Sequence, residues 1–344
     1  MIGSRKVPAP LLALTIAIAI AATAVAAATT PVTAAANLSA AEGATQSVTT
    51  GAARQLFVGS SPCGSPVRER LRIASSEACE LIEWQVTLHR DPRTATPTRY
   101  ELQSDYGPVE QGQPGLGRSA KSATRSGTWT IAKGRQGDPD ATVYELDGAI
   151  SLLAVDEGVL HLLDGNGYLL VGNGGWSYAL NRDDLAESPP RRRLWRAPPE
   201  RAYPITELAA GPDVFGVFEG RSPCQRIADQ LGVPVEPQCG KAKWRLTLLR
   251  QGDGTPGRYK VEGSLQLAGP REGSWSVLRG IPEDPDAVVY RLAPSTSASA
   301  LLLLVGDENV LFFLDERLRP LVGSAQFSYV LNRRQVPERQ PSAG

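Results

Sequence analysis

The chain has 344 residues, and its 36 Lys and Arg residues balance 36 Asp and Glu residues, so the formal net charge is zero. This balance argues against the strong positive field of a nucleic-acid-binding protein and gives no general attraction to an acidic membrane. The length allows two ordinary domains. The 34 Gly and 27 Pro favour short strands and many turns over long helices.

The N-terminal segment is typical of an export signal. Arg5 and Lys6 precede the apolar run "LLALTIAIAIAATAVA", and small residues follow at Ala24 and Ala26. This order predicts a signal peptide over 1–26, and the alternative is an uncleaved anchor, because the run almost reaches the length that spans a bilayer. No cysteine follows the run, so lipidation is not expected. The mature protein is therefore predicted to be periplasmic or secreted, without a transmembrane domain.

The rest of the chain contains two similar halves. Equivalent residues lie 161, 160, 146 and 151 positions apart as the chain proceeds, so insertions and deletions separate the copies. The marker pairs are Cys63 and Cys224, Trp84 and Trp244, Trp129 and Trp275, Tyr144 and Tyr290, and Asn181 and Asn332. The expected order is the signal peptide 1–26, an Ala/Thr/Ser-rich flexible spacer 27–53, repeat 54–182, a Pro/Arg-rich linker 183–213, repeat 214–334 and a disordered tail 335–344.

Each repeat has the pattern of an all-β domain. Segments such as "WQVTLHR" and "WRLTLLR" alternate with period two, and Asp-rich turns punctuate the apolar runs that follow. Seven or eight such segments favour an antiparallel barrel or sandwich in each repeat. The difference in offset places about 14 extra residues in the first copy, between 103 and 123, where we expect a loop. Short helices are expected only between the cysteines.

Residues capable of catalysis are few. The chain has two histidines, and the positions equivalent to His89 and His161 in the second copy are Leu249 and Phe312. No nucleophile elbow, zinc-protease helix or phosphate-binding loop is recognisable. We therefore predict no catalytic residues, no enzymatic activity and no cofactor.

Paired aspartates recur in both copies around a proline. Asp138 and Asp140 in the first repeat correspond to Asp284 and Asp286 in the second. Carboxylates two residues apart can share a calcium ion. However, Asp-Pro-Asp before a strand is also favourable turn chemistry, and the turn is the preferred interpretation.

The repeated tryptophans allow two interpretations. Trp84, Trp129, Trp244 and Trp275 lie at the beginning or centre of predicted strands. In a closed barrel such side chains usually fill the core. The alternative is that they line a cavity for a small apolar ligand, which makes them candidate ligand-binding residues.

The four cysteines are the most informative residues. Exported proteins meet an oxidising compartment, where paired cysteines close disulfides, and four cysteines allow three pairings. The duplication selects Cys63 with Cys79 and Cys224 with Cys239, because each domain should carry its own bond. Closing loops of this length contributes about 3 kcal/mol in the chain-entropy model. Two thiols per copy without a shared histidine are too few to predict a metal site.

The order of motifs in each repeat resembles the N-terminal domain of the NlpE family, envelope lipoproteins linked to copper resistance and surface sensing. The matching segments are "GSSPC" and "GRSPC", "VTL" and "LTL", "RYEL" and "YKVEG", "GTW" and "GSW", and "HLLDGNGYL" and "FFLDERLRPL". The resemblance implies a small lipocalin-like or OB-like barrel and an envelope location. The chain departs from the family at the second cysteine of its Cys-x-x-Cys motif, where Pro66 and Ile227 stand, and it has no lipobox cysteine.

These observations together predict a non-enzymatic exported envelope protein with two NlpE-like barrels. Its expected role is binding, envelope stress sensing or metal (copper) homeostasis, with an envelope protein as partner. The alternative is a soluble module that binds a small apolar ligand or acts as an inhibitor.

Overall fold

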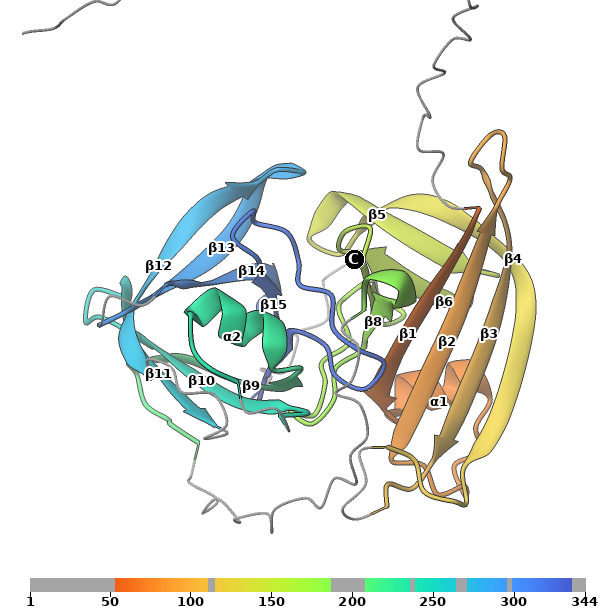
Figure 1. Ribbon diagram of the computed structural model, residues 1–344, viewed down its shortest axis with the longest axis horizontal. Helices are drawn as coiled ribbons and strands as arrows, with labels where there is room; N and C mark the ends of the chain where they lie inside the picture. The colour runs from red at the N-terminus through yellow and green to blue at the C-terminus, as the bar shows by residue number, and fades with distance from the viewer. Residues whose placement is uncertain are drawn as a thin grey trace, which may run out of the picture. The chain divides into compact units, whose positions relative to one another are not determined.

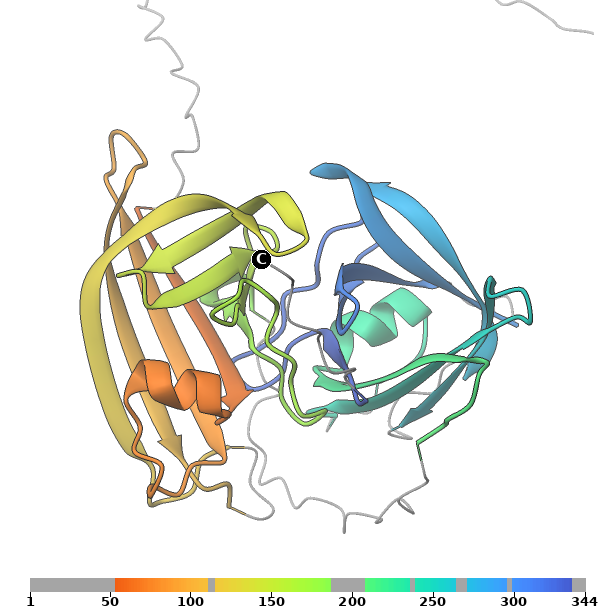
Figure 2. The same ribbon diagram turned by 180° about the vertical axis from the view of Figure 1, so that it is seen from behind.

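The computed structural model describes residues 53–110, 115–186, 208–235, 239–263, 271–295 and 299–335. It contains two closed antiparallel barrels of eight strands each, which confirms the predicted all-β class and tandem barrels (Figures 1 and 2). Both barrels belong to one compact unit, Val48–Gly344. The expected signal peptide, and all of the spacer except residue 53, lie outside the described residues, as do much of the linker and of the tail.

Barrel 1 and barrel 2 have the same order of elements, with a short helix after the first strand. Barrel 1 consists of β1 (Arg54–Pro62), α1 (Ser65–Leu71), β2 (Leu81–Arg90), β3 (Pro97–Gly107), β4 (Lys121–Arg135), β5 (Asp138–Leu146), β6 (Ile150–Ala154), β7 (Val159–Leu162) and β8 (Ala179–Arg182), followed by the 3-10 helix η1 (Asp183–Leu185). Barrel 2 consists of β9 (Val214–Ser222), α2 (Gln225–Leu231), β10 (Ala242–Arg250), β11 (Pro256–Gly263), β12 (Glu272–Ile281), β13 (Asp284–Pro294), β14 (Leu301–Asp307), β15 (Val310–Leu314) and β16 (Val330–Arg333).

Each barrel is a meander in which every strand pairs with the next and the last strand closes onto the first. The seam of barrel 1 pairs Val58 with Asn181, and that of barrel 2 pairs Glu219 with Asn332. Alternating side chains point inward and form one apolar cluster inside each barrel. Both helices lie between the cysteines, as expected, and Val67 on α1 and Ile227 on α2 are fully buried against these clusters.

Glycine is required where each barrel closes. A Cβ atom on Gly59 would lie 2.5 Å from the carbonyl oxygen of Ala179, and one on Gly220 would lie 2.2 Å from the carbonyl oxygen of Val330. Backbone oxygens cannot move aside as a flexible side chain can. The first residue of the repeated "GSSPC" and "GRSPC" motifs is therefore a packing requirement of the seam.

Replacing Gly220 with alanine is expected to lower the free energy of unfolding by about 2 kcal/mol, because the methyl group forces the closing strands apart. Urea denaturation of the oxidised protein would measure the loss. Gly252→Ala is the matched control, since a Cβ at Gly252 meets no atom within 4 Å. Equal stability of the two variants would contradict this account of the seam.

The extra residues of the first copy were expected to form a loop, and this prediction is wrong for part of the stretch. Part of this stretch lengthens the hairpin of β3 and β4, which pair continuously from Arg99 opposite Thr128 to Tyr106 opposite Lys121. In the longer ladder, the backbone N–H and C=O groups of these residues bond to the neighbouring strand. In an exposed loop, they would bond to water instead. Residues 111–114 within the stretch lie outside the described part of the chain.

The repeated aspartates form turns. Asp138 Oδ1 accepts hydrogen bonds from the amides of Asp140 and Ala141, and Asp284 Oδ1 accepts one from the amide of Asp286. A carboxylate that binds the backbone two or three residues ahead is a favourable way to start a tight turn. These contacts support the preferred interpretation of the Asp-Pro-Asp pattern.

The outward face of one side of each barrel is also buried. A third apolar cluster combines residues of β5 to β8 in barrel 1 with the equivalent residues of β13 to β16 in barrel 2. Its equivalent pairs are Ala141 and Ala287, Val143 and Val289, Leu153 and Leu304, Val159 and Val310, Leu163 and Leu314, and Ala179 and Val330. Strands buried on both faces read as continuous apolar runs, and "VLFFL" of β15 is buried at every position. The contact is isologous, because the same surface of each repeat faces its counterpart.

Two asparagines and two glycines hold this interface together by reciprocal hydrogen bonds. Asn332 Oδ1 accepts from the Gly172 amide at 2.7 Å, and Asn181 Oδ1 accepts from the Gly323 amide at the same 2.7 Å. Asn181 Nδ2 also donates to the carbonyl oxygen of Ser324 at 3.0 Å. The hydrogen bond that Asn332 accepts thus has the same length as the one that Asn181 accepts, with the roles of the two barrels exchanged.

His161 lies in the interface between the barrels, where it contacts Phe312, its counterpart in barrel 2. It is fully buried, and its ring meets the Phe312 ring edge-on at a centroid distance of 5.6 Å. Nδ1 lies 3.0 Å from the carbonyl oxygen of Leu162, while Nε2 has no hydrogen-bond partner. Burial is the main cause that lowers the pKa of His161 to about 4, and the charge of Arg135 adds to the effect.

Replacing His161 with phenylalanine, its counterpart in barrel 2, is expected to make the protein less sensitive to acid. An unfolded histidine titrates at about pH 6.5. Between that pH and the folded pKa of about 4, the unfolded state binds more protons. The free energy of unfolding therefore falls as the pH falls through this window. On going from pH 7 to pH 5, the wild type should lose about 2 kcal/mol relative to His161→Phe.

Asp156, on the same hairpin, changes the free energy of unfolding in the opposite direction as the pH falls. Burial raises its pKa to about 6, so the folded state holds its proton more tightly and gains stability as the pH falls. Because Asp156 is present in both proteins, its effect cancels when their denaturation curves are compared at each pH. Identical pH profiles for the wild type and His161→Phe would contradict the proposed titration of His161.

Candidate functional site

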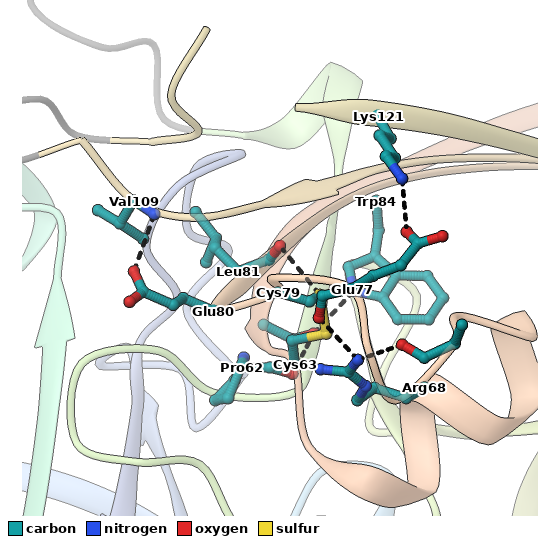
Figure 3. The surroundings of a disulfide bond; sticks show 12 residues. Pro62, Cys63, Arg68, Glu77, Cys79, Glu80, Leu81, Trp84, Val109 and Lys121 are labelled. Carbon is teal, nitrogen blue, oxygen red and sulfur yellow. Dashed lines mark hydrogen bonds and ion pairs between the residues drawn. A yellow bond between two sulfur atoms is a disulfide. The ribbon is translucent and has the colours of Figure 1, made fainter. Parts of the chain in front are cut away.

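The disulfides lie where each helix follows the first strand. They join Cys63 to Cys79 with a Cα separation of 5.7 Å and Cys224 to Cys239 with one of 6.0 Å, the pairing that the duplication favours. Figure 3 shows Arg68 of α1 beside the first bond, where its guanidinium donates to the carbonyl oxygen of Glu77 at 2.9 Å. Because all four sulfurs are bonded in disulfides, they are oxidised and offer no thiolate to a metal.

Trp84 and Trp244 lie beside these disulfides and inside the barrels. The indole Nε1 of Trp84 donates to Ser61 Oγ at 2.8 Å, and that of Trp244 donates to Ser222 Oγ at 2.9 Å. Both serines belong to the repeated Gly-x-Ser-Pro-Cys segment. This segment therefore combines the seam glycine, the acceptor for the indole and the disulfide cysteine within five residues.

Trp129 and Trp275 occupy the opposite end of each barrel, where β2 and β10 finish. Their indole Nε1 atoms donate to the carbonyl oxygens of His89 at 2.8 Å and Leu249 at 2.6 Å. The rings pack against Tyr144 at 5.0 Å and Tyr290 at 5.2 Å between centroids. The His89 side chain is partly buried, with Nε2 3.5 Å from a Glu101 carboxylate oxygen.

All four tryptophans thus belong to the core clusters of their barrels, with their polar atoms satisfied. A buried indole N–H with a partner is the arrangement expected of a core residue. A small apolar ligand in either interior would have to displace these packed rings. The arrangement favours the interpretation of the tryptophans as core residues.

An arginine covers the aromatic rings at this end of each barrel. In barrel 1 the Arg90 guanidinium lies 4.6 Å from the centroid of the Trp129 ring and donates to Ala95 O at 3.0 Å. In barrel 2 the equivalent Arg250 lies 4.6 Å from the centroid of Phe215. Guanidinium groups stack favourably on aromatic faces at such distances.

A second arginine at this end has different partners in the two barrels. Arg182, the last residue of β8, forms a bidentate pair with Asp184, with distances of 2.8 and 3.0 Å. The equivalent Arg333 of β16 instead donates to the carbonyl oxygens of Glu308 at 2.8 Å and Phe215 at 2.9 Å. The position equivalent to Asp184 is occupied by Gln335, which has no charge. We call Phe215, Arg250, Arg333 and Gln335 the barrel 2 arginine cluster.

This cluster is not among the sites predicted from the sequence. The motifs "SYALNR" and "SYVLNR" served only as markers of the duplication. A comparison of the residues that follow, "DD" in the first copy and "RQ" in the second, would have shown that a carboxylate is lost. The convergence of Phe215 and Arg250 on Arg333 could not be read from the sequence, because these residues are distant along the chain.

Comparison of the chain with protein-family models, with curated protein sequences and with solved structures gave no match. In the part of the chain that the structure describes, no helix has the length and apolar character needed to cross a membrane. Within the same residues, no three His, Cys, Asp or Glu side chains are grouped so as to hold a metal ion.

Proposed function

We propose that the chain is a non-enzymatic, exported protein of the cell envelope that acts by recognising another envelope protein through the outer surfaces of two NlpE-like barrels. Two disulfides support an oxidising compartment, where such bonds persist. Of the roles that the resemblance implies, binding and stress sensing agree with this arrangement better than copper homeostasis, because the cysteine sulfurs are engaged in disulfides.

The observation that carries this proposal is the exposure of apolar side chains at the same place on both barrels. Ile131 on β4 and Val277 on β12 are equivalent residues, and each is 44% exposed. Leu278, next to Val277, is 40% exposed. Apolar side chains that remain exposed on a strand are a common feature of protein–protein interaction sites.

Site-specific photo-crosslinking in the native compartment tests this proposal. A photoreactive residue at Ile131 or Val277 should give a discrete adduct with one partner protein. The matched control is Gln85, an exposed position on β2, which should give none. Adducts of equal yield at all three positions, or at none of them, would contradict recognition through this surface.

The alternative, an apolar ligand inside a barrel, predicts a different result. Such a ligand should appear as an additional non-covalent mass in native mass spectrometry of the protein purified from its own compartment. Its removal should also change the tryptophan fluorescence, because all four candidate tryptophans lie in the interior. A stoichiometric ligand of this kind would replace the proposal of partner recognition.

A further inference from the structure

The barrel 2 arginine cluster places two positive charges beside one aromatic ring. The guanidinium of Arg250 lies 4.6 Å and that of Arg333 5.3 Å from the centroid of Phe215. Among the described residues, neither guanidinium has a carboxylate oxygen within 4 Å. Like charges that share one site repel each other unless an opposite charge is present. The carboxylates of Glu308 and Asp307 act on the Arg333 guanidinium only from beyond ion-pair distance, so within the described part of the chain the cluster has no direct counter-charge.

The backbone is shaped to hold Arg333 in this position. A Cβ atom on Gly216 would lie only 2.4 Å from Arg333 Nη1, so a glycine is needed for the guanidinium to lie against the strand. The Phe218 ring lies 4.7 Å below it, and two carbonyl oxygens accept its hydrogen bonds. These contacts fix the direction of the guanidinium without neutralising it, and its remaining N–H groups can still donate.

Barrel 1 provides an internal comparison. There, Asp184 neutralises Arg182, and the Glu157 carboxylate is a second anion, with Oε2 4.0 Å from Nη1 of the same guanidinium. In barrel 2 Gln335 stands in place of Asp184, and Gly216 stands in place of Gln55. The two differences act together: one removes the internal anion and the other makes room for the cation. A shallow depression of about 160 Å³ results, and it is lined by Gly211, Val214, Phe215, Gly216, Arg333 and Gln335.

We propose that this depression at the end of barrel 2 binds a phosphate group, as free phosphate or as a phosphate monoester. Arginine is the residue best suited to phosphate, because its planar N–H groups match the phosphate oxygens. A dianion can accept from Arg333 in the depression while Arg250 contributes a second positive charge at its rim. This inference does not depend on the proposed protein partner, whose contact surfaces on β4 and β12 are different ones.

Isothermal titration of the mature, oxidised protein with inorganic phosphate at low ionic strength tests the proposal. Saturable binding at one site per chain is expected, and it should weaken as sodium chloride screens the charges. Arg250→Gln should weaken binding by about tenfold, because it removes one charge from an exposed side chain without opening the core. Gln335→Asp should abolish binding, because it supplies the carboxylate that Asp184 supplies in barrel 1.

The matched control is Arg90→Gln, which removes the equivalent arginine of barrel 1 and should leave phosphate binding unchanged. Circular dichroism would verify that each variant is folded. In the second arm, acetate replaces phosphate and should bind more weakly, since a monoanion does not balance two guanidinium groups. Absence of saturable phosphate binding, equal losses in Arg90→Gln and Arg250→Gln, or equal affinity for acetate would each overturn the proposal.

Discussion

Replacing Asn181 with alanine is expected to lower the free energy of unfolding by about 4 kcal/mol, because it leaves the buried Gly323 amide and the Ser324 carbonyl oxygen without partners. The side chain is fully buried between the barrels, so water cannot replace it without opening the interface. Equilibrium denaturation in urea would measure the loss.

The equivalent variant, Asn332→Ala, should cost only about 2 kcal/mol, because it leaves one buried group unsatisfied. Asn332 Nδ2 has no partner in the folded protein, and only its Oδ1 accepts a bond, from Gly172. The difference has a structural cause: the carbonyl oxygen of Asn173, which corresponds to that of Ser324, accepts from Arg334 instead. Asn166→Ala, in an exposed turn, is the control with no expected loss. Equal effects of Asn181→Ala and Asn332→Ala would refute this assignment.

Removing one disulfide should cost about 3 kcal/mol. The Cys224→Ala/Cys239→Ala variant releases a bond that closes a sequence separation of 15 residues, and the expected loss comes mainly from the greater freedom of the unfolded chain. Urea denaturation of this variant, with Cys63→Ala/Cys79→Ala as its counterpart, measures the effect in each barrel. Because the counterpart bond closes a separation of 16 residues, similar losses are expected.

The same bonds predict the behaviour toward copper. The native protein should show no free thiol when it is denatured without reductant, and it should compete poorly for Cu(I), since a disulfide offers no thiolate ligand. Thiol titration and a Cu(I) competition assay would be carried out on the same preparation. Free thiols together with tight, stoichiometric Cu(I) binding and a higher melting temperature would favour a metal site instead of a structural clamp.

The resemblance to the NlpE N-terminal domain remains a hypothesis about origin and role. The segments that carry it have structural explanations in this chain: the Gly-x-Ser-Pro-Cys segment contains the seam glycine, an indole acceptor and a disulfide cysteine. Such requirements would hold in any barrel with this helix and this closure. At the two departures from the family motif, Pro66 lies in the first turn of α1 and Ile227 is buried on α2.

The sequence by itself determined the repeated unit, the all-β class, the disulfide pairing and the tight turns. These features depend on contacts that are close along the chain or on a period of two residues, so they can be read from local patterns. Asp138 and Asp284 are an example, because each carboxylate binds backbone amides only two or three residues away.

Tertiary structure alone decided how the barrels meet and where unbalanced charge remains. The contact of His161 with Phe312 joins residues 151 positions apart, and the stacking of Arg333 on Phe215 spans 118. Such contacts follow from barrel closure and from the packing of one outward face on another, which no local pattern encodes. The Asp184-to-Gln335 difference is visible in the sequence, but its meaning depends on a guanidinium that only the closed barrel places beside it.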